Sequence, residues 1–282
     1  MHLLPLGTLA ERMSAGHTAQ LLGPEVVTPA TVEDWRPGKL MRCGVFDLHL
    51  ARGPGRVEVA PAGTTWTLVV PLSGTVAAAL ADVREPAMLA PGDLVLAAPG
   101  AAVELVLERP ACVATLSAPP RSAATLSAAG ATGSQPRGLS WLVRRDTLDE
   151  ALAPRDKVKI AETMLWRPEA APGRWEGGTE IRCEAFSFGV FRTGAPESAH
   201  QHQLTWEMYH VLEGTLRLKV RTYRLGAWEP VELHATESLV LPPGSAHLVE
   251  QGCAHRSLAI QTPPAGTDRE IVSVSSLPPA PA

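Results

Sequence analysis

The chain has 282 residues, a formal net charge of −4 and an ordinary apolar fraction of 45%, which together predict about two globular domains. It contains no basic stripe, so composition argues against nucleic acid as a partner. The longest apolar runs, such as Leu68–Leu72, are far too short to span a membrane. Proline and glycine are abundant while long amphipathic patterns are scarce, which favours many short strands joined by turns.

The cysteines and the N-terminus bear on the cellular compartment. The cysteines are widely separated, and none belongs to a Cys-x-x-Cys pair: Cys43, Cys112, Cys183 and Cys253. We expect buried thiols rather than a disulfide framework in a chain of this length. Residues 1–16 contain Glu11 and Arg12 within a short apolar run, which is unlike a secretory signal. These features predict a soluble, cytoplasmic protein.

Two segments of the chain repeat one pattern. Thr65–Val76 reads TWTLVVPLSGTV, and Thr205–Leu216 reads TWEMYHVLEGTL. Farther on, Leu89–Leu105 resembles Leu233–Val249. The second copy has a longer connection around Leu225–Pro230, and insertions of that size belong in surface loops. The chain therefore contains two copies of one β unit.

The segments around the two copies set the predicted domain boundaries. Residues 118–138 are small, polar and proline-rich, which predicts a linker. A short helix is expected near Leu148–Leu152, and the chain becomes proline-rich again from Thr262. The predicted domains are residues 1–117 and residues 139–265, followed by a tail of residues 266–282.

The second copy reads as a series of strands. Val211–Val220 alternates around Glu213-Gly214, which we predict to be a hairpin corner because glycine tolerates positive φ. Pro242-Pro243-Gly244 ends the run Ser238–Leu241, because proline cannot continue a ladder. After the corner the two faces alternate: Leu216, Leu218 and Val220 form an inner face, and Arg217, Lys219 and Arg221 form a solvated outer face.

Six of the nine histidines lie in one stretch of the second copy that begins at His200. On a strand, His200 and His202 share a face at about 6.5–7 Å, from which two imidazoles can converge on one ion. Glu207 follows after a bend, with Tyr209 on the same face, and His247 directly follows the Pro-Pro-Gly turn. A His-x-His pair alone is more often solvated or hydrogen-bonded than metal-binding, so spacing alone leaves both alternatives open.

Two motifs give the second copy a resemblance to the cupin superfamily. The first cupin motif is matched by Gly194, His200, His202, Glu207 and Gly214. The second is matched by Pro242, Gly244 and His247, while Thr236 and Gln251 depart from it outside the ligand set. The resemblance covers roughly Trp166–Gln261. It implies an all-β protein with two jelly-roll β-barrels in tandem and few short helices, in which His200, His202, Glu207 and His247 bind one divalent metal ion.

The first copy lacks these ligands. The repeat aligns Ala60, Ala62, Thr67 and Val103 with the four ligand positions of the second copy. None of these side chains can hold a divalent ion. The first barrel, which resembles a cupin over about Met41–Leu116, is therefore expected to be free of metal.

The predicted ligand set bears on function. Three histidines and one carboxylate leave two positions open on an octahedral ion, and an open position argues for catalysis. Imidazole with carboxylate suits Fe, which we favour, or Mn, Ni, Zn, Co or Cu. The favoured function is an Fe(II) dioxygenase acting on a small organic molecule, with Glu207 as ligand and proton acceptor and Tyr209 as a substrate contact. A redox-neutral isomerase, cyclase or lyase and a non-catalytic sensory module remain alternatives.

Several other side chains have two open interpretations. Gln203 is either a pocket residue or part of a surface loop, and Trp206, matched by Trp66, is expected to pack in the core. His210 is expected to be structural or solvated, whereas His234 and His255 match no ligand position.

Four apolar residues line either the pocket or the contact between the barrels: Met164, Trp166, Phe186 and Phe188. The pocket is short of fixed positive charge, although Arg192 is available in a loop. Exposed sheet edges are covered either by a homodimer or by the two barrels themselves.

Overall fold

The computed structural model describes most of both repeated units. The described residues are 4–5, 27–30, 39–42, 46–59, 64–80, 83, 85–108, 110–119, 137–162, 170–192, 197–221, 228–235, 237–241, 243–264 and 268–272. Strands dominate this part of the chain, and its one helix, α3 (Arg145–Leu152), confirms the short helix expected there. The fold is all-β, as predicted. The described helix is not long and apolar enough to cross a membrane.

The first barrel consists of two sheets. Its strands are β3 (Lys39–Arg42), β4 (Asp47–Arg52), β5 (Gly55–Val59), β6 (Trp66–Ser73), β7 (Val76–Leu80), β8 (Ala87–Leu89), β9 (Leu94–Ala97), β10 (Val103–Leu107), β11 (Cys112–Ala118), β12 (Ser140–Val143) and β14 (Gly173–Arg174). The larger sheet has the order β14-β12-β9-β6-β11-β4-β3, and the smaller one β5-β10-β7-β8. Aliphatic side chains from both sheets, such as Val69, Leu89 and Val113, fill the space between them.

The second barrel is built around one long strand. Its strands are β1 (Leu4–Pro5), β2 (Val27–Ala30), β13 (Lys157–Glu162), β15 (Ile181–Arg182), β16 (Ser187–Arg192), β17 (His200–His202), β18 (Trp206–Arg221), β19 (Glu229–His234), β20 (Ser238–Leu241), β21 (Ala246–Val249), β22 (His255–Thr262) and β23 (Arg269–Ile271). The first half of β18 pairs with β20 and β22, and the second half pairs with β19 and β21. Leu216, Leu218 and Val220 lie in its apolar core, which confirms the predicted inner face.

The two barrels pack against each other through a shared apolar core. This core contains Trp66 and Trp206, the two tryptophans matched by the repeat, and both are buried as expected. Trp66 stacks on Trp141 with ring centroids 6.2 Å apart. Phe186 and Phe188 belong to the same core, so they lie at the contact between the barrels, whereas Met164 and Trp166 lie outside the described residues. Strand β6 is buried on both faces for this reason, since one face lines its own barrel and the other meets the second barrel.

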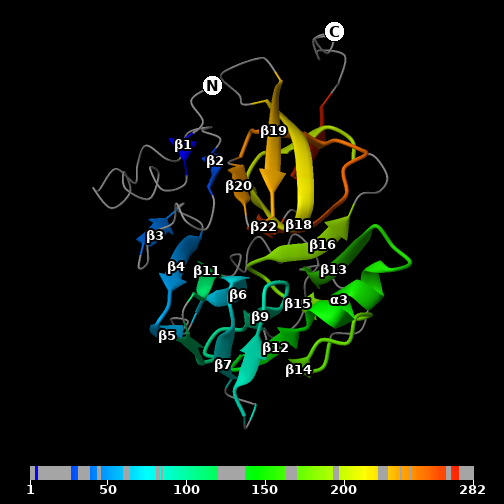
Figure 1. The fold of residues 1–282 in the computed structure, drawn as a ribbon. Coiled ribbons are helices and arrows are strands. Elements are labelled where there is room, and N and C mark those ends of the chain that lie inside the picture. The colour runs from blue at the N-terminus through cyan, green and yellow to red at the C-terminus, as the bar shows by residue number, and fades with distance from the viewer. Residues whose placement is uncertain are drawn as a thin grey trace.

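The two halves of the chain exchange edge strands. Near the N-terminus, β2 pairs with β20 of the second barrel, and β1 and β2 lie beside β20 in Figure 1. Conversely, β12 from the second half pairs with β9 of the first barrel. The sheets therefore cross the boundaries predicted at residues 117 and 139, and each barrel covers an edge of the other. Most of the predicted linker, residues 120–136, lies outside the described residues.

The repeat is visible in the backbone, but one predicted corner is wrong. Gly74 and Gly214, which the repeat aligns, have φ of 66° and 73°. In the second barrel, however, Glu213-Gly214 is not a hairpin corner, because β18 continues through it to Arg221. The register of β18 against β22 shifts between Val211 and Glu213. The positive φ of Gly214 thus bends a continuous strand as it passes from one sheet to the other.

Replacing Gly214 by alanine is expected to destabilise the second barrel strongly. A Cβ atom there would overlap the carbonyl oxygen of Ala254, in addition to the cost of positive φ. Gly252 is the matched control, because its φ is +89° and a Cβ would meet no atom within 4 Å. Gly252→Ala should cost about 1–2 kcal/mol, and Gly214→Ala about 1–3 kcal/mol more. Denaturant unfolding checks the difference, and equal costs would contradict the close approach.

Two of the four first-barrel positions that align with the candidate ligands are described, and neither carries a metal-binding group. Val103 is buried among aliphatic side chains, and Thr67 hydrogen-bonds Ser117, with 3.0 Å between their hydroxyl oxygens. Ala60 and Ala62 lie outside the described residues. Cys112, Cys183 and Cys253 are buried thiols, as expected, and Cys43 lies outside the described part.

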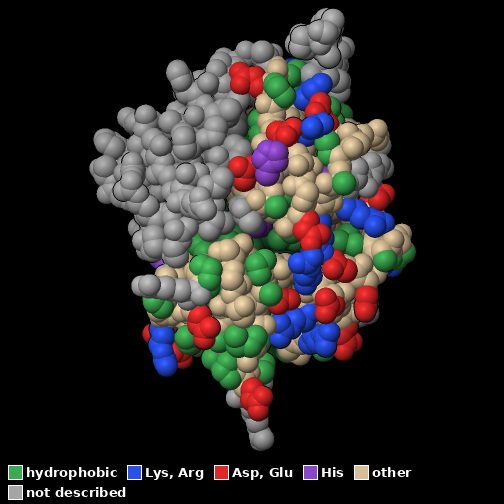
Figure 2. Space-filling model, viewed as in Figure 1, with side chains coloured by type: hydrophobic (Ala, Val, Ile, Leu, Met, Phe, Trp, Pro, Cys, Tyr) green, Lys and Arg blue, Asp and Glu red, His purple; other side chains and the backbone are tan. Residues whose placement is uncertain are grey.

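Charged side chains of both signs are interspersed on the molecular surface, as Figure 2 shows over α3 and β13. Many form ion pairs across strands. Arg217 Nε lies 2.7 Å from Glu232 Oε2, and Lys219 Nζ lies 3.1 Å from Glu250 Oε1. The basic residues of β18 are therefore on the solvated outer face, as predicted.

Candidate metal centre

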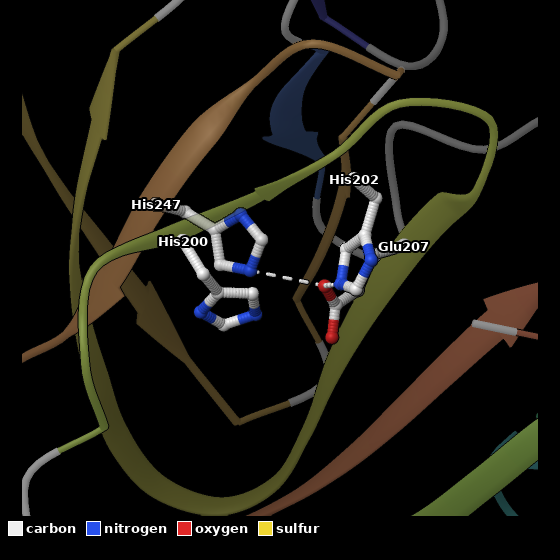
Figure 3. Close-up of side chains that lie close together, drawn as sticks. All are labelled: His200, His202, Glu207 and His247. Atoms are coloured by element: carbon white, nitrogen blue, oxygen red, sulfur yellow. Dashed lines mark ion pairs between the residues drawn. The ribbon is translucent and has the colours of Figure 1, made fainter. Parts of the chain in front are cut away.

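Three strands bring four potential ligands together inside the second barrel. β17 carries His200 and His202 on one face, with Gln201 between them on the other. Its neighbour β21 carries His247 directly opposite His200, and Glu207 lies near the start of β18. All four side chains are buried, and one ligand atom from each lies within 4.8 Å of the others. Figure 3 shows the three imidazoles and the carboxylate converging.

The carboxylate of Glu207 lies among the imidazoles. Its Oε2 atom is 3.0 Å from Nε2 of His247 and 3.3 Å from Nε2 of His202. The rings of His200 and His247 have centroids 4.2 Å apart. The carboxylate and the imidazoles therefore converge on one point inside the barrel.

The outer nitrogen of each imidazole has its own acceptor. Nδ1 of His200 lies 2.9 Å from the carbonyl oxygen of Ser198, and Nδ1 of His247 lies 3.1 Å from that of Ser245. Nδ1 of His202 lies 3.3 Å from Oδ1 of Asp268. Metal-binding histidines are oriented in the same way, with one ring nitrogen turned to a hydrogen-bond acceptor and the other facing the ion.

Burial and neighbouring charges shift the pKa values of His200, His202 and Glu207 in different directions. Burial, reinforced by His247, lowers the pKa of His200 to about 3. For His202, burial acts against the charged ring, but Asp268 and Glu207 outweigh it and raise its pKa to about 9. Burial also opposes the charge on Glu207, yet the imidazoles of His247 and His202 hold its pKa well below the ordinary value. Glu207 is therefore ionised at neutral pH.

The buried polar atoms of the cluster and the types of its side chains are both suited to a divalent metal ion. Oε2 of Glu207 and Nε2 of His247 are buried and face each other at 3.0 Å, yet neither makes a hydrogen bond of good geometry to any described residue. An unpaired buried polar atom is costly, so two facing each other call for a missing partner. Three imidazole nitrogens and one carboxylate oxygen form a donor set suited to Fe, Mn, Co, Ni, Cu or Zn. The cluster therefore fits a metal site, and the donor set alone does not choose the metal.

Two residues that the motifs did not indicate hold the ligands in place. Gln261 lies opposite Glu207 in the register of β18 and β22, and its Nε2 is 3.1 Å from Oε1 of Glu207. With Oε1 engaged, Oε2 is the oxygen that faces the imidazoles. Asp268, in the predicted tail, bonds His202 as described above. The local sequence does not predict that Gln261 or Asp268 contacts a ligand, because both reach the cluster through the pairing of strands that are distant in sequence.

A cavity of about 380 Å³ opens beside the cluster. Glu207 and Tyr209 line it, as the shared face of β18 predicts. Tyr209 is buried, and its ring centroid lies 5.9 Å from that of His247. Burial, reinforced by the charge of Glu207, raises the pKa of Tyr209 well above the ordinary value, so its hydroxyl stays protonated. Apolar side chains also line the cavity: Phe191, Val249 and Ala259.

Two arginines of the cavity lie beside carboxylates. Arg269 Nη2 is 3.4 Å from Glu197 Oε1, and Arg192 Nε is 3.8 Å from Asp156 Oδ1. All four residues line the cavity, together with Lys157. The charges of these two arginines are thus partly offset, while Lys157 adds a further positive charge to the cavity.

The remaining histidines and polar residues have separate surroundings. His210 is buried and bonds the Ser238 hydroxyl at 2.8 Å, so it is structural. His234 is exposed, and His255 is buried and lines the cavity away from the ligand set. Gln203 is exposed and donates to Glu270, which fits the surface interpretation. Gln251 lines the cavity, while Gly194, Thr236 and Pro242 lie outside the described residues.

The fold is similar to those of several solved structures. A cupin 2 conserved barrel domain protein from Leptotrichia buccalis has 11% identity, with 84% of this chain and 97% of that chain covered and a TM-score of 0.51. Protein Ylba from E. coli has 11% identity, 86% and 96% coverage and a TM-score of 0.53. Salicylate 1,2-dioxygenase from Pseudaminobacter salicylatoxidans has 13% identity, 77% and 71% coverage and a TM-score of 0.51.

These likenesses are carried by the fold rather than by the sequence. No protein-family model and no curated protein matches the chain by sequence. The structure is a pair of β-barrels with a buried imidazole–carboxylate cluster in the second. The fold is a pair of cupin-type barrels, like that of these solved structures.

Proposed function

We propose that the second barrel is a metal-dependent catalytic centre and that the protein is a dioxygenase of a small organic molecule. One observation carries the proposal: three imidazoles and one carboxylate, all buried, meet beside a cavity of about 380 Å³. A closed structural site would have no such cavity, because structural ions are fully coordinated by protein. Iron is the metal we favour within the donor set.

The chain's own residues have distinct roles in this proposal. His200, His202, Glu207 and His247 would hold the ion, which when bound supplies a Lewis acid and, if it is iron, a redox centre for chemistry with dioxygen. The low pKa of Glu207 makes its carboxylate a better ligand than a proton acceptor at neutral pH. The protonated Tyr209 hydroxyl is placed to donate a hydrogen bond to a substrate oxygen. The apolar wall around Phe191 excludes water from the reacting groups.

The similarity to known structures supports the reaction class. One similar structure is named a salicylate 1,2-dioxygenase, so the same fold serves a dioxygenase in that protein. A redox-neutral isomerase, cyclase or lyase is the second candidate. The observation that favours it is the protonated Tyr209 hydroxyl, a proton donor that faces the same cavity as the proposed metal ligand Glu207.

Metal analysis and oxygen uptake test the proposal. Protein purified under nitrogen should contain stoichiometric divalent metal, with iron the species that supports turnover. A screen of small hydroxylated aromatic acids, salicylate among them, should then reveal a compound whose addition causes oxygen consumption. Chelator-treated protein is the control, and oxygen consumption should return when Fe(II) is restored.

The outcomes separate the candidates. Protein without metal, and with a thermal stability unchanged by chelator, would contradict the metal centre. Bound metal with turnover but without oxygen uptake would favour the redox-neutral candidate. Bound metal without turnover of any compound would instead favour a sensory module.

A further inference from the structure

The second barrel is completed by a strand from the end of the chain. β23 lies antiparallel to β17, with Ile271 opposite His200 and Arg269 opposite His202. The residues of β23 fall in the predicted tail. The pairing places Asp268, which directly precedes β23, next to the turn that joins β17 to β18.

Asp268 connects this strand to the ligand cluster through both carboxylate oxygens. Oδ1 lies 3.3 Å from Nδ1 of His202. Oδ2 accepts the backbone N–H of Leu204 at 3.2 Å and that of Thr205 at 3.0 Å. The side chain is only 10% exposed. One carboxylate thus fixes both the ring of His202 and the turn that sets the spacing between His202 and Glu207.

The β17–β18 turn makes further hydrogen bonds to the C-terminal segment. The Thr205 hydroxyl donates to the carbonyl oxygen of Pro263 at 3.0 Å. The backbone N–H of Gln203 lies 3.4 Å from the carbonyl oxygen of Asp268 itself. The C-terminal segment therefore holds the β17–β18 turn by side chain and by backbone.

His202 differs from the other two histidines in this respect. His200 and His247 donate Nδ1–H to backbone carbonyls, which no substitution removes. Nδ1 of His200 also lies 3.4 Å from Nη2 of Arg269, but among the three only His202 has a side-chain acceptor at Nδ1, and that carboxylate is 66 residues away in sequence. A carboxylate at Nδ1 fixes the tautomer and orientation of an imidazole and increases its basicity toward a metal.

We infer that Asp268 is a positioning residue for the metal centre, which holds His202 and the β17–β18 turn in the geometry that binds the ion. The inference rests on the proposed metal function and goes beyond it, because it makes the C-terminal strand part of the site. Asp268 is not one of the four residues that would hold the ion. Its removal should weaken metal binding while leaving all four ligands in the chain.

Co²⁺ titration of the full chain tests this role. Asp268→Ala should lower the Co²⁺ affinity, measured by competition with a chromophoric chelator, by about 10–100-fold. It should also change the visible spectrum of bound Co²⁺, which reports the number and geometry of the ligands. Asp268→Asn should recover part of the affinity, because its amide oxygen can still accept the His202 N–H.

Glu270→Ala is the matched control. Glu270 lies in β23, two residues after Asp268, and is exposed, and it accepts hydrogen bonds from Gln201 and Gln203 on the outer side. Its replacement should leave Co²⁺ affinity within about twofold, since it has no contact with a ligand. Loss of affinity in both variants to the same degree would show that strand stability, and not Asp268, matters, and would overturn the inference.

Thermal unfolding in chelator checks that each metal-free variant is folded. If Asp268→Ala does not fold, Asp268→Asn decides: a weakened affinity in a folded Asn variant supports the inference, and wild-type affinity overturns it. A folded Asp268→Ala variant with wild-type affinity and spectrum would also overturn it, while leaving the proposed metal function intact. A wild-type chain that binds no Co²⁺ would contradict the metal function, and this inference with it.

Discussion

Replacing both His200 and His247 by alanine is expected to abolish stoichiometric metal binding. The two side chains face each other across β17 and β21 and supply half of the donor set. If the roughly 10–16 kcal/mol of a four-ligand zinc site is shared among its ligands, two ligands contribute about 5–8 kcal/mol. The affinity should therefore fall by about 10⁴- to 10⁶-fold. Metal content after dialysis and a Co²⁺ titration measure the loss.

His234→Ala is the control for this pair. His234 is an exposed histidine at the end of β19, outside the cluster. Its replacement should leave metal content unchanged. Retained stoichiometric metal in the double variant would mean that the ligands are other residues. Far-UV circular dichroism of both variants in chelator establishes that the barrels remain folded, so that lost metal reports the site and not the fold.

Metal binding is expected to release a proton and to strengthen with pH. In the metal-free protein, Asp268 and Glu207 outweigh burial and raise the pKa of His202 to about 9, so at neutral pH the ring carries a proton that an ion must displace. His200, with a pKa of about 3, is already neutral. Below pH 9, displacing one proton changes the apparent affinity about tenfold per pH unit. The affinity should therefore fall about 100-fold between pH 8 and pH 6.

Calorimetry in buffers with different ionisation enthalpies measures this proton. At pH 7.5 the apparent binding enthalpy should vary linearly with the buffer's ionisation enthalpy, with a slope close to one released proton. Above pH 9.5 His202 is neutral before binding, and the slope should shrink. A binding enthalpy that does not depend on the buffer at pH 7.5 would contradict the raised pKa of His202.

The sequence predicts the ligand cluster because its signals are local. His200 and His202 share a face by the two-residue period of a strand, and Glu207 and Tyr209 share a face by the same rule. The turn that follows β20 places His247 at the start of β21. The structure brings all four side chains to one point. Positive φ at Gly214 was also foreseeable, since glycine adopts it without strain.

Other features depend on pairing that local patterns do not encode. The sequence places a hairpin corner at Gly214, yet β18 continues through it, because neighbours in two different sheets hold its two halves. The exchange of β2 and β12 between the barrels is equally invisible locally, since a strand's pattern shows which face is buried but not which edge it joins. The burial of β6 on both faces follows only once the barrels pack together.

The sequence by itself determined the all-β class, the two copies and the four candidate ligands, because strand periodicity and short motifs are properties of neighbouring residues. Only the tertiary structure decided that Gln261 holds Glu207 and that Asp268 holds His202. The physical reason is that a candidate ligand is recognised from its residue type and from the strand face on which it lies. A residue that orients a ligand must in addition lie within hydrogen-bond distance of it, about 3 Å. That partner comes from whichever distant strand the sheet places alongside, here β22 and the residue preceding β23.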